Sequence, residues 1–383
     1  MRAYVFTDRA LASQAGRFVW LELDTEDPRN AAIRKRLDIP ALPTFFIVDP
    51  ADERVALRWV GGATVAQLKR ILDDGAMAVR EPGLPPREGG ADAAFARAER
   101  LYGAADWAAA AGAYEEALAH APEGWAHYAR SVESALFAYS SVDSNEKLAR
   151  LAHDAYPRLA RTSSSANVAG SGLDAALALP AGHPERAAWV DFFERGCRDI
   201  LADPSIALAG DDRSAVYIAL LDARHDAKDD AGARQVAGAW ASFLEGEAAR
   251  AKTPDARAVY DSHRLSAYLE LGQPERAIPM LTASERDLPG DYNPPARLAT
   301  AYRALKRWDD ALAASDRAMA RAYGPRKLLL YQVRSDVYVG RADSTAARRT
   351  LEEAVAYADA LPPGQRSEST LAALRKRLAA FGQ

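Results

Sequence analysis

The chain has 383 residues, a net charge of −4 and a pI near 6.0, so its overall charge gives no reason to expect binding to nucleic acid or to an anionic membrane. Hydrophobic residues make up 49% and charged residues 27%, which excludes a mainly disordered chain. No apolar run is long enough to span a bilayer, and the N-terminus lacks the apolar core of a secretory signal. The sequence as it stands is therefore expected to be cytoplasmic, and its location stays open if the chain starts further upstream.

Residues 1–80 differ in composition from the rest of the chain and are expected to form a small α/β domain. Short apolar runs bounded by turn and acidic residues predict buried strands, and Gly61-Gly62 predicts a turn before the last helix. The expected elements are a strand at Phe18–Asp24, a helix at Arg29–Leu37, strands at Thr44–Asp49 and Arg54–Val60, and a helix at Thr64–Asp73.

Three stretches of this segment resemble the thioredoxin family. DIPALPTFFIVD at residues 38–49 is similar to the family's loop in which a proline, here Pro43, is cis and faces the active site. WVGGATVAQLKRIL at 59–72 is similar to its glycine turn and last helix, and VFTDRALASQAGRFVWLELDTED at 5–27 resembles its first helix leading into its second strand. The resemblance implies a cis Leu42–Pro43 bond and peptide contacts from Leu42, Pro43 and Thr44.

The segment departs from the family because it lacks the family's first strand and its Cys-x-x-Cys. Dithiol chemistry needs two thiols, and Cys197 is the only cysteine of the chain. The absent strand belongs between Phe18–Asp24 and Thr44–Asp49, which would then expose unpaired backbone edges. Two explanations stay open, a degenerate domain or a chain start placed too far downstream, and the intact remaining pattern favours the second. In a third interpretation, Arg2–Phe6 is itself the first strand.

Residues 81–90, EPGLPPREGG, predict a linker, and residues 91–383 are expected to be helical. Within DWAAAAGAYEEALAHAP at Asp106–Pro122, the spacing of Ala110, Tyr114 and Ala117 places them on one helical face, and Pro122 ends the helix. The same spacing recurs along the chain. The expected repeat packing positions are Ala110, Tyr114, Ala117, Ala277, Leu281, Ala311, Ala318, Ala347, Leu351 and Ala354, with a weaker copy at Ala233, Ala237 and Trp240.

This recurrence resembles the tetratricopeptide repeat (TPR), a helix–turn–helix unit of about 34 residues. Ala277 and Ala311 are 34 residues apart, and Gly272 stands where the family has its turn glycine. The clearest repeats are expected at 91–124, 258–291, 292–325 and 328–361, with a capping helix at 365–381. The predicted fold is thus mostly α, an α-solenoid of TPR-like hairpins preceded by a partial thioredoxin-like domain.

Between the clear repeats, divergent helical hairpins are expected. Ser, Asp, Gly and Pro residues separate helical patterns at Gly124–Ser141, Asn145–Arg161, Ala166–Leu179, Pro184–Ala202 and Arg213–Lys228. Glu245–Arg257 is expected to be an insertion or a lengthened helix. Pro279, which lies inside an apolar helical pattern, is expected to distort its helix.

The sequence predicts no catalytic, cofactor-binding or metal-binding residues. Cys197 lies in a helical pattern typical of a buried small hydrophobe, and the six histidines are scattered. Gly170-Ser171-Gly172 is typical of neither a nucleophile elbow nor a phosphate loop.

The predicted function is therefore a non-catalytic scaffold that binds a polypeptide partner in the concave groove implied by the TPR resemblance. Some TPR proteins hold a C-terminal carboxylate with a clamp of Lys, Asn and Arg. The corresponding first-helix positions here are Ala94, Arg97, Asp261, Arg264, Pro295 and Leu298, which lack that set. The alternative is a thiol–disulfide oxidoreductase or redox chaperone whose Cys-x-x-Cys lies upstream of Met1.

Overall fold

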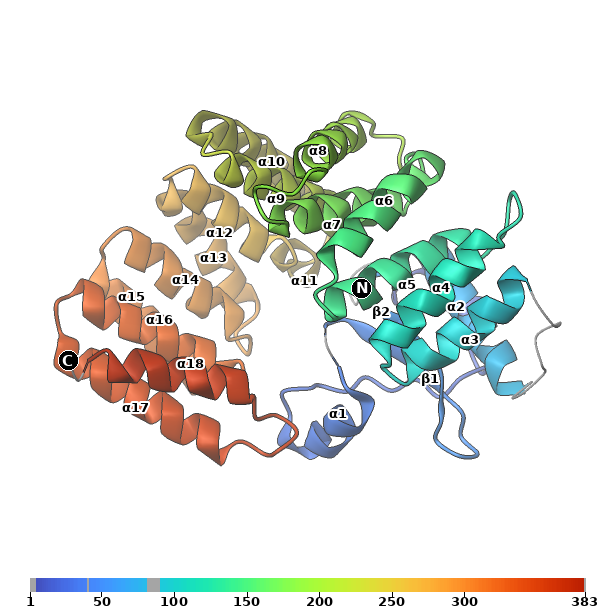
Figure 1. The fold of residues 1–383 in the computed structure, drawn as a ribbon. Coiled ribbons are helices and arrows are strands. Elements are labelled where there is room, and N and C mark those ends of the chain that lie inside the picture. The colour runs from blue at the N-terminus through green and yellow to red at the C-terminus, as the bar shows by residue number, and fades with distance from the viewer. Residues whose placement is uncertain (1–4, 40, 81–89, 382–383) are drawn as a thin grey trace. The chain divides into compact units, whose positions relative to one another are not determined.

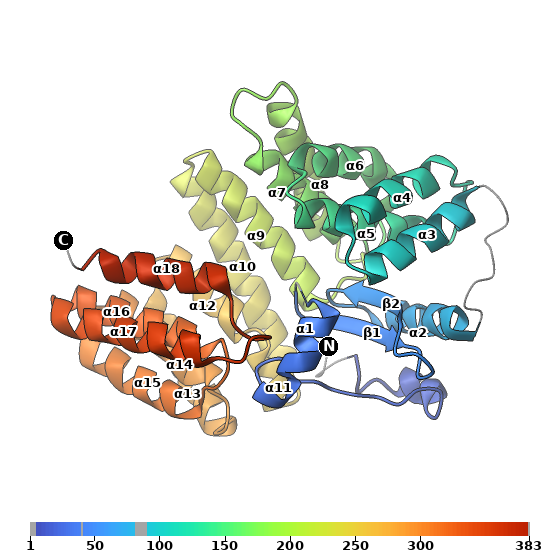
Figure 2. The same ribbon diagram turned by 60° about the horizontal axis from the view of Figure 1, so that its bottom comes forward.

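The computed structural model describes residues 5–39, 41–80 and 90–381 and divides into two compact units (Figures 1 and 2). The first unit comprises residues 1–15 and 41–236, and the second comprises residues 16–40 and 237–383. Apart from two strands, the regular structure of the described residues is helical. The predicted class, a mostly α chain of helical hairpins, is confirmed.

A two-stranded antiparallel sheet lies near the start of the first unit. β1 (Thr44–Val48) pairs with β2 (Val55–Val60), and α2 (Val65–Arg80) packs on both strands. The strands expected after residue 43 are present, and the helix that follows them extends to Arg80 rather than ending at Asp73. The 3₁₀ turn η1 (Arg9–Gln14) also contacts α2.

The strand expected at Phe18–Asp24 is absent, and this prediction is wrong. The segment has no regular structure, and Val19 and Leu21 are 89% and 76% exposed. A strand persists when a neighbouring strand pairs its backbone groups, and the described residues form only the β1–β2 sheet. Apolar composition alone does not supply that neighbour. The interpretation of Arg2–Phe6 as a strand also fails for its described part, because Val5 and Phe6 lie in a turn.

The helix expected at Arg29–Leu37 is present, but it belongs to the second unit. It consists of the 3₁₀ turn η2 (Pro28–Asn30) followed by α1 (Ala31–Leu37). The loop before the last helix of the chain runs beside α1 in both views of the ribbon (Figures 1 and 2). Residues 16–40 therefore belong to the same compact unit as the C-terminal repeats and not to the unit that contains the sheet.

The division into units differs from the boundary expected at residues 81–90. β2 packs on α3 (Ala91–Gly103), the first helix after that stretch. The Arg130 Nη2 donates to the Arg58 carbonyl at 2.6 Å and pairs with the Glu99 carboxylate at 3.0 Å. These contacts join the sheet to the first repeats, so residues 1–80 do not form a compact unit alone. The expected linker lies almost entirely outside the described residues.

The helices of the first unit form successive hairpins. They are α3 with α4 (Trp107–Ala119), α5 (Tyr128–Ser141) with α6 (Asn145–Leu159), α7 (Ser165–Ala178) with α8 (Arg186–Ala202), and α9 (Gly210–Asp226) with α10 (Asp230–Arg250). The five helices expected between residues 124 and 228 are confirmed, with starts and ends shifted by up to four residues. The lengthened-helix interpretation of Glu245–Arg257 is confirmed by α10, which falls in the second unit from Ala237 onward.

The second unit continues with hairpins of similar size. After α11 (Pro254–Ala258), they are α12 (Asp261–Glu270) with α13 (Ala277–Asp287), α14 (Asn293–Ala304) with α15 (Trp308–Arg321), and α16 (Lys327–Gly340) with α17 (Ser344–Ala360). α18 (Glu368–Ala379) follows as the expected capping helix. The distortion expected at Pro279 is not found inside α13. A 3₁₀ turn, η3 (Pro274–Arg276), precedes that helix, so Pro279 lies in its first turn, where its missing N–H is tolerated.

Six hairpins have the same type of turn between their two helices. In each turn, one residue shortly after the first helix has a positive φ, in the left-handed region. These residues are Ala105, Asp143, Lys228, Gly272, Lys306 and Ala342, and each N–H donates to the carbonyl three residues earlier. The next N–H donates five residues back, for example Asp106 to Leu101. These two hydrogen bonds satisfy backbone carbonyl groups at the end of the first helix. It identifies α5/α6 and α9/α10 as members of the same series, although only Gly272 carries the glycine that the resemblance requires.

All ten strong packing positions are buried without measurable exposure: Ala110, Tyr114, Ala117, Ala277, Leu281, Ala311, Ala318, Ala347, Leu351 and Ala354. Alanine at most of them lets neighbouring helices approach closely. The weaker copy is also buried, with Ala233, Ala237 and Trp240 at 5%, 0% and 2% exposure. Because these positions are occupied by packing, a ligand must bind elsewhere on the hairpins.

Candidate functional site

The first helices of successive hairpins lie next to one another within each unit. In the second unit α12 contacts α14 and α14 contacts α16, while in the first unit α3, α5, α7 and α9 form a similar series. This arrangement produces a continuous row of first helices, with the second helices of the hairpins packed behind them. Side chains that project from the row are therefore the natural place to search for a binding site.

A buried polar cluster lies on this row in the second unit. The Asp261 side chain on α12 is completely buried, and neither of its carboxylate oxygens accepts a hydrogen bond from the described residues. Burial raises the pKa of Asp261, whereas the nearby Ser284 hydroxyl and the Arg297 guanidinium oppose that rise. The Ser284 hydroxyl and the neighbouring positive charges therefore both favour the charged form of this buried acid.

Two arginines of this cluster make no ion pair with the described residues. Arg297 on α14 is partly buried, and burial lowers its pKa although the nearby Asp261 carboxylate opposes this. Arg264 on α12 is also partly buried, donates only a long 3.4 Å bond to the Tyr268 hydroxyl, and has a buried Nε without an acceptor. A guanidinium carries five donors, so both side chains retain unused hydrogen-bonding capacity.

The six first-helix positions considered in the sequence do not all face outward. Ala94, Asp261, Pro295 and Leu298 are buried in the packing. Arg97 is half exposed and pairs with Glu116, which leaves Arg264 as the member with spare donors. Arg297 was missed because it lies one residue before the position that the repeat spacing selects. The sequence feature that could have indicated Arg297 is the presence of an arginine within the apolar pattern of α14.

The Leu42–Pro43 bond is cis, which confirms that prediction. Leu42 is 52% exposed, and the Thr44 hydroxyl donates to the Ala41 carbonyl at 2.6 Å. The Gly61 N–H donates to the Pro43 carbonyl at 2.8 Å and ties the loop to the end of β2. The loop is therefore fixed at its base, while the Leu42 side chain stays accessible.

Cys197 on α8 is completely buried, as its helical pattern predicts. Burial raises the pKa of its thiol to about 12, and the Asp174 and Glu194 carboxylates add to that rise. The thiol is therefore neutral near pH 7 and is shielded from solvent. Because the thiolate is the reactive form, Cys197 is unsuited to nucleophilic or redox chemistry.

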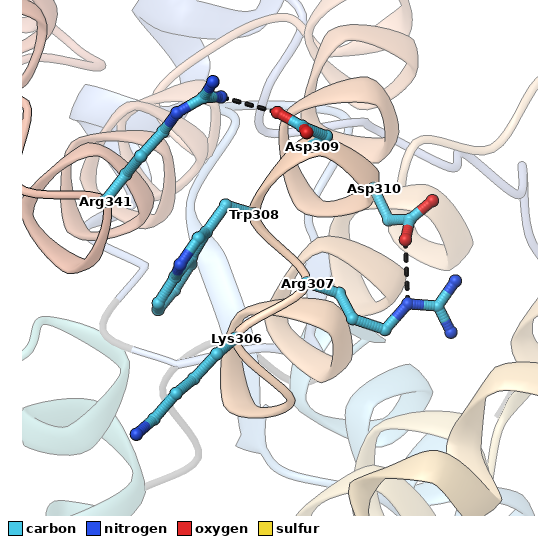
Figure 3. A pocket seen from close by; sticks show the side chains of 6 residues that line it. All are labelled: Lys306, Arg307, Trp308, Asp309, Asp310 and Arg341. Atoms are coloured by element: carbon cyan, nitrogen blue, oxygen red, sulfur yellow. Dashed lines mark hydrogen bonds and ion pairs between the residues drawn. The ribbon is translucent and has the colours of Figure 1, made fainter.

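A surface hollow of about 390 Å³ lies at the α14/α15 turn, beside the end of α16 (Figure 3). Its lining residues are Lys306, Arg307, Trp308, Asp309, Asp310 and Arg341. Arg341 pairs with Asp309 at 2.6 Å and Arg307 with Asp310 at 2.8 Å, as the dashed lines in Figure 3 show. Since the two acids neutralise two of the three bases there, the hollow offers little concentrated charge to a ligand.

Comparisons with known proteins do not identify the chain. No family model matches it, and none of the curated proteins is a significant match. Among solved structures it is similar to the TPR2AB-domain:pHSP90 complex of yeast Sti1, with 14% identity over 76% of this chain and 98% of that one and a TM-score of 0.28.

It is also similar to a Rap protein complexed with competence and sporulation factor, with 12% identity, 81% and 79% coverage and a TM-score of 0.37. A third similar structure is Acl4, an assembly chaperone of RpL4, with 13% identity, 77% and 98% coverage and a TM-score of 0.35. All three structures have TM-scores below 0.5 and sequence identities below 25%. The assignment of helical repeats therefore rests on the shared turns and the buried packing positions.

Within the described parts of the chain, no helix is long and apolar enough to cross a membrane. The same residues contain no group of three or more His, Cys, Asp or Glu side chains that could hold a metal ion. The polar cluster on α12 and α14 is thus the best-supported candidate site.

Proposed function

We propose that this chain is a non-catalytic interaction scaffold that binds a polypeptide partner through the first helices of its second unit. The observation that carries the proposal is the pair Arg264 and Arg297, which stand on adjacent first helices, partly buried and without ion-pair partners among the described residues. Two cations with spare donors on one continuous row suit an extended ligand.

The chemistry of these side chains defines the partner's contribution. A partly buried guanidinium without an acceptor has lost water and gained little in return. A backbone carbonyl or a carboxylate of a bound polypeptide would supply the missing acceptor, and a planar guanidinium binds a carboxylate through two parallel hydrogen bonds. The buried Asp261 carboxylate attracts the Arg297 guanidinium electrostatically and so helps to position it.

An array of short synthetic peptides, followed by titration of the best binders, tests this proposal. We expect Arg264→Ala and Arg297→Ala each to weaken binding at least about tenfold, the cost of losing one charge-assisted hydrogen bond. Arg349→Ala is the matched control, because Arg349 lies exposed on the second helix α17. Unchanged binding by both test variants, with thermal stability preserved, would contradict the proposal.

The oxidoreductase alternative has one observation in its favour, the cis Leu42–Pro43 bond. In this interpretation residues 1–80 derive from a thioredoxin-like domain, and Leu42, Pro43 and Thr44 form a second peptide contact. The attack-and-resolve cycle of that chemistry needs two thiols, which this alternative places upstream of Met1, and the described residues offer only the buried Cys197. The scaffold function is therefore the better supported of the two.

A further inference from the structure

Three consecutive residues of the N-terminal segment are bound by the C-terminal repeats of the same unit. The Tyr323 hydroxyl donates to Asp24 Oδ2 at 2.5 Å, and the Gln365 Nε2 donates to the Thr25 carbonyl at 3.0 Å. The Arg326 backbone N–H donates to Glu26 Oε2 at 2.8 Å. The repeats therefore contact a side chain, a backbone carbonyl and a second side chain in succession, as a peptide-binding site does.

The receiving surface is formed by the loop before α16 and the loop before α18. Arg326 is the residue that caps the start of α16, a helix of 14 residues, and it has no cap from its own side chain. The Glu26 carboxylate fills that role from a remote segment, where the helix dipole favours negative charge. The Arg326 Nε lies 3.7 Å from the other Glu26 oxygen and adds a weaker attraction.

Gln365 points independently to a ligand at this surface. Its side chain is only 2% exposed, and its Oε1 accepts no hydrogen bond from the described residues. Burying an amide in this way is costly unless its groups are used, and the one used group is the donor to Thr25. The buried amide therefore contacts the segment's backbone through its Nε2 group.

Two glycines let the segment's main chain approach the surface. A Cβ on Gly324, whose φ is +63°, would lie 2.5 Å from the Glu26 carbonyl oxygen. A Cβ on Gly364 would lie 2.0 Å from the Ala31 carbonyl oxygen. Any larger residue at either position would displace the segment. The close fit extends along the segment from Glu26 to Ala31.

The segment is held at these residues and has no regular secondary structure just before them. Val19 and Leu21 are highly exposed, and residues 19–24 have no secondary structure. Tyr292 and Arg326, which surround the docked acid, also influence Arg297 electrostatically. The docked acids therefore lie near the arginine cluster of the candidate site.

We propose that the surface formed by Tyr323, Gly324, Arg326 and Gln365 is a recognition site for a short acidic peptide of the form Asp-x-Glu. The chain fills this site with its own Asp24–Glu26, so an acidic peptide of a partner binds only by displacing that segment. The site lies on inter-repeat loops and not on the first-helix row, so it stands or falls separately from the proposed scaffold function.

The test uses the full chain and a fluorescent peptide of residues 21–30, LELDTEDPRN. We expect the peptide to bind the D24N/E26Q variant at least about tenfold more tightly than it binds the wild type, because the internal ligand has lost both charges. The same peptide with Asn and Gln in place of the two acids is expected to bind neither protein. Adding Tyr323→Phe to the D24N/E26Q variant is expected to weaken binding about tenfold.

Tryptic cleavage at Arg29, Arg34, Lys35 and Arg36 provides the second readout. Cleavage there is expected to accelerate in the D24N/E26Q variant, and in the wild type when excess unlabelled peptide is added. The wild-type experiment remains decisive if the variant does not fold. Equal peptide binding by wild type and variant, or cleavage that neither the substitutions nor the peptide accelerates, would overturn the proposal.

Discussion

Different kinds of contact stabilise the two-stranded sheet of the first unit and the C-terminal hairpins of the second unit. Each hairpin satisfies its own turn within a few residues and packs on the next hairpin along the chain. The sheet is joined instead to distant residues, with Arg130 donating to the Arg58 carbonyl across 72 positions. The repeats therefore depend mainly on local pattern, whereas the sheet depends on remote side chains.

The largest expected effect is at the contact that joins the sheet to the first hairpins. In Glu99→Ala, Arg130 is left with an unpaired charge, since both side chains of this pair are only 14% exposed. Breaking a buried pair costs about 3–5 kcal/mol, so the free energy of unfolding in urea is expected to fall by that amount. The Tyr114 hydroxyl, which donates to Glu99 at 2.5 Å, loses its partner as well.

Glu116→Ala is the matched control for this prediction. Its pair with Arg97 lies at the surface, where both side chains are 47% exposed, and surface pairs contribute about 0–1 kcal/mol. Similar losses in the two variants would mean that the Glu99–Arg130 contact does not hold the sheet to the repeats.

A smaller effect is expected from overpacking one repeat. Ala311 is completely buried on α15, so Ala311→Leu is expected to lower the free energy of unfolding by about 1–3 kcal/mol. Ala313 is exposed on the same helix, and Ala313→Leu is expected to change stability by less than about 0.5 kcal/mol. An Ala311→Leu variant as stable as the wild type would remove the basis for the repeat assignment.

The same contrast explains what the sequence predicted well. The ten packing positions, the five middle helices and the capping helix depend on the identity and spacing of nearby residues, so a local pattern was sufficient. The turns at Asp143 and Lys228 were missed because a left-handed residue other than glycine leaves a weak signal. The cis bond before Pro43 followed from the resemblance of a short loop.

The features that escaped prediction depend on remote partners. Phe18–Asp24 has the composition of a strand, yet the described residues provide no strand beside it. Asp24 and Tyr323 are 299 positions apart, so no local pattern indicates their contact. Asp261 and Arg297 come together only when two hairpins stack. The candidate site was therefore less predictable than the helices that carry it.

Leu21→Ser tests the correction at Phe18–Asp24. Because Leu21 is 76% exposed, this change is expected to alter the free energy of unfolding by no more than about 0.5 kcal/mol. A buried strand residue would lose more than 1 kcal/mol, which is about the cost of removing buried apolar area. A loss of that size in thermal or urea unfolding would mean that the segment packs as a strand after all.

The smallest expected effect is on thiol chemistry. The native chain is expected not to reduce insulin disulfides above a no-protein control, because its only cysteine is buried and its thiol has a raised pKa. A thiol-reactive dye is expected to label Cys197 only after unfolding. Rapid labelling of the native chain, or sustained insulin reduction, would contradict the assignment of Cys197 as a packing residue.

The central claim, binding of a polypeptide on the row of first helices, is tested most directly by photo-crosslinking. A peptide selected from the array carries a photoreactive group, and the crosslinked residues of the full chain are mapped by mass spectrometry. We expect crosslinks on α12, α14 and α16, concentrated near Arg264 and Arg297. Crosslinks that map consistently to α13, α15 and α17 would contradict it.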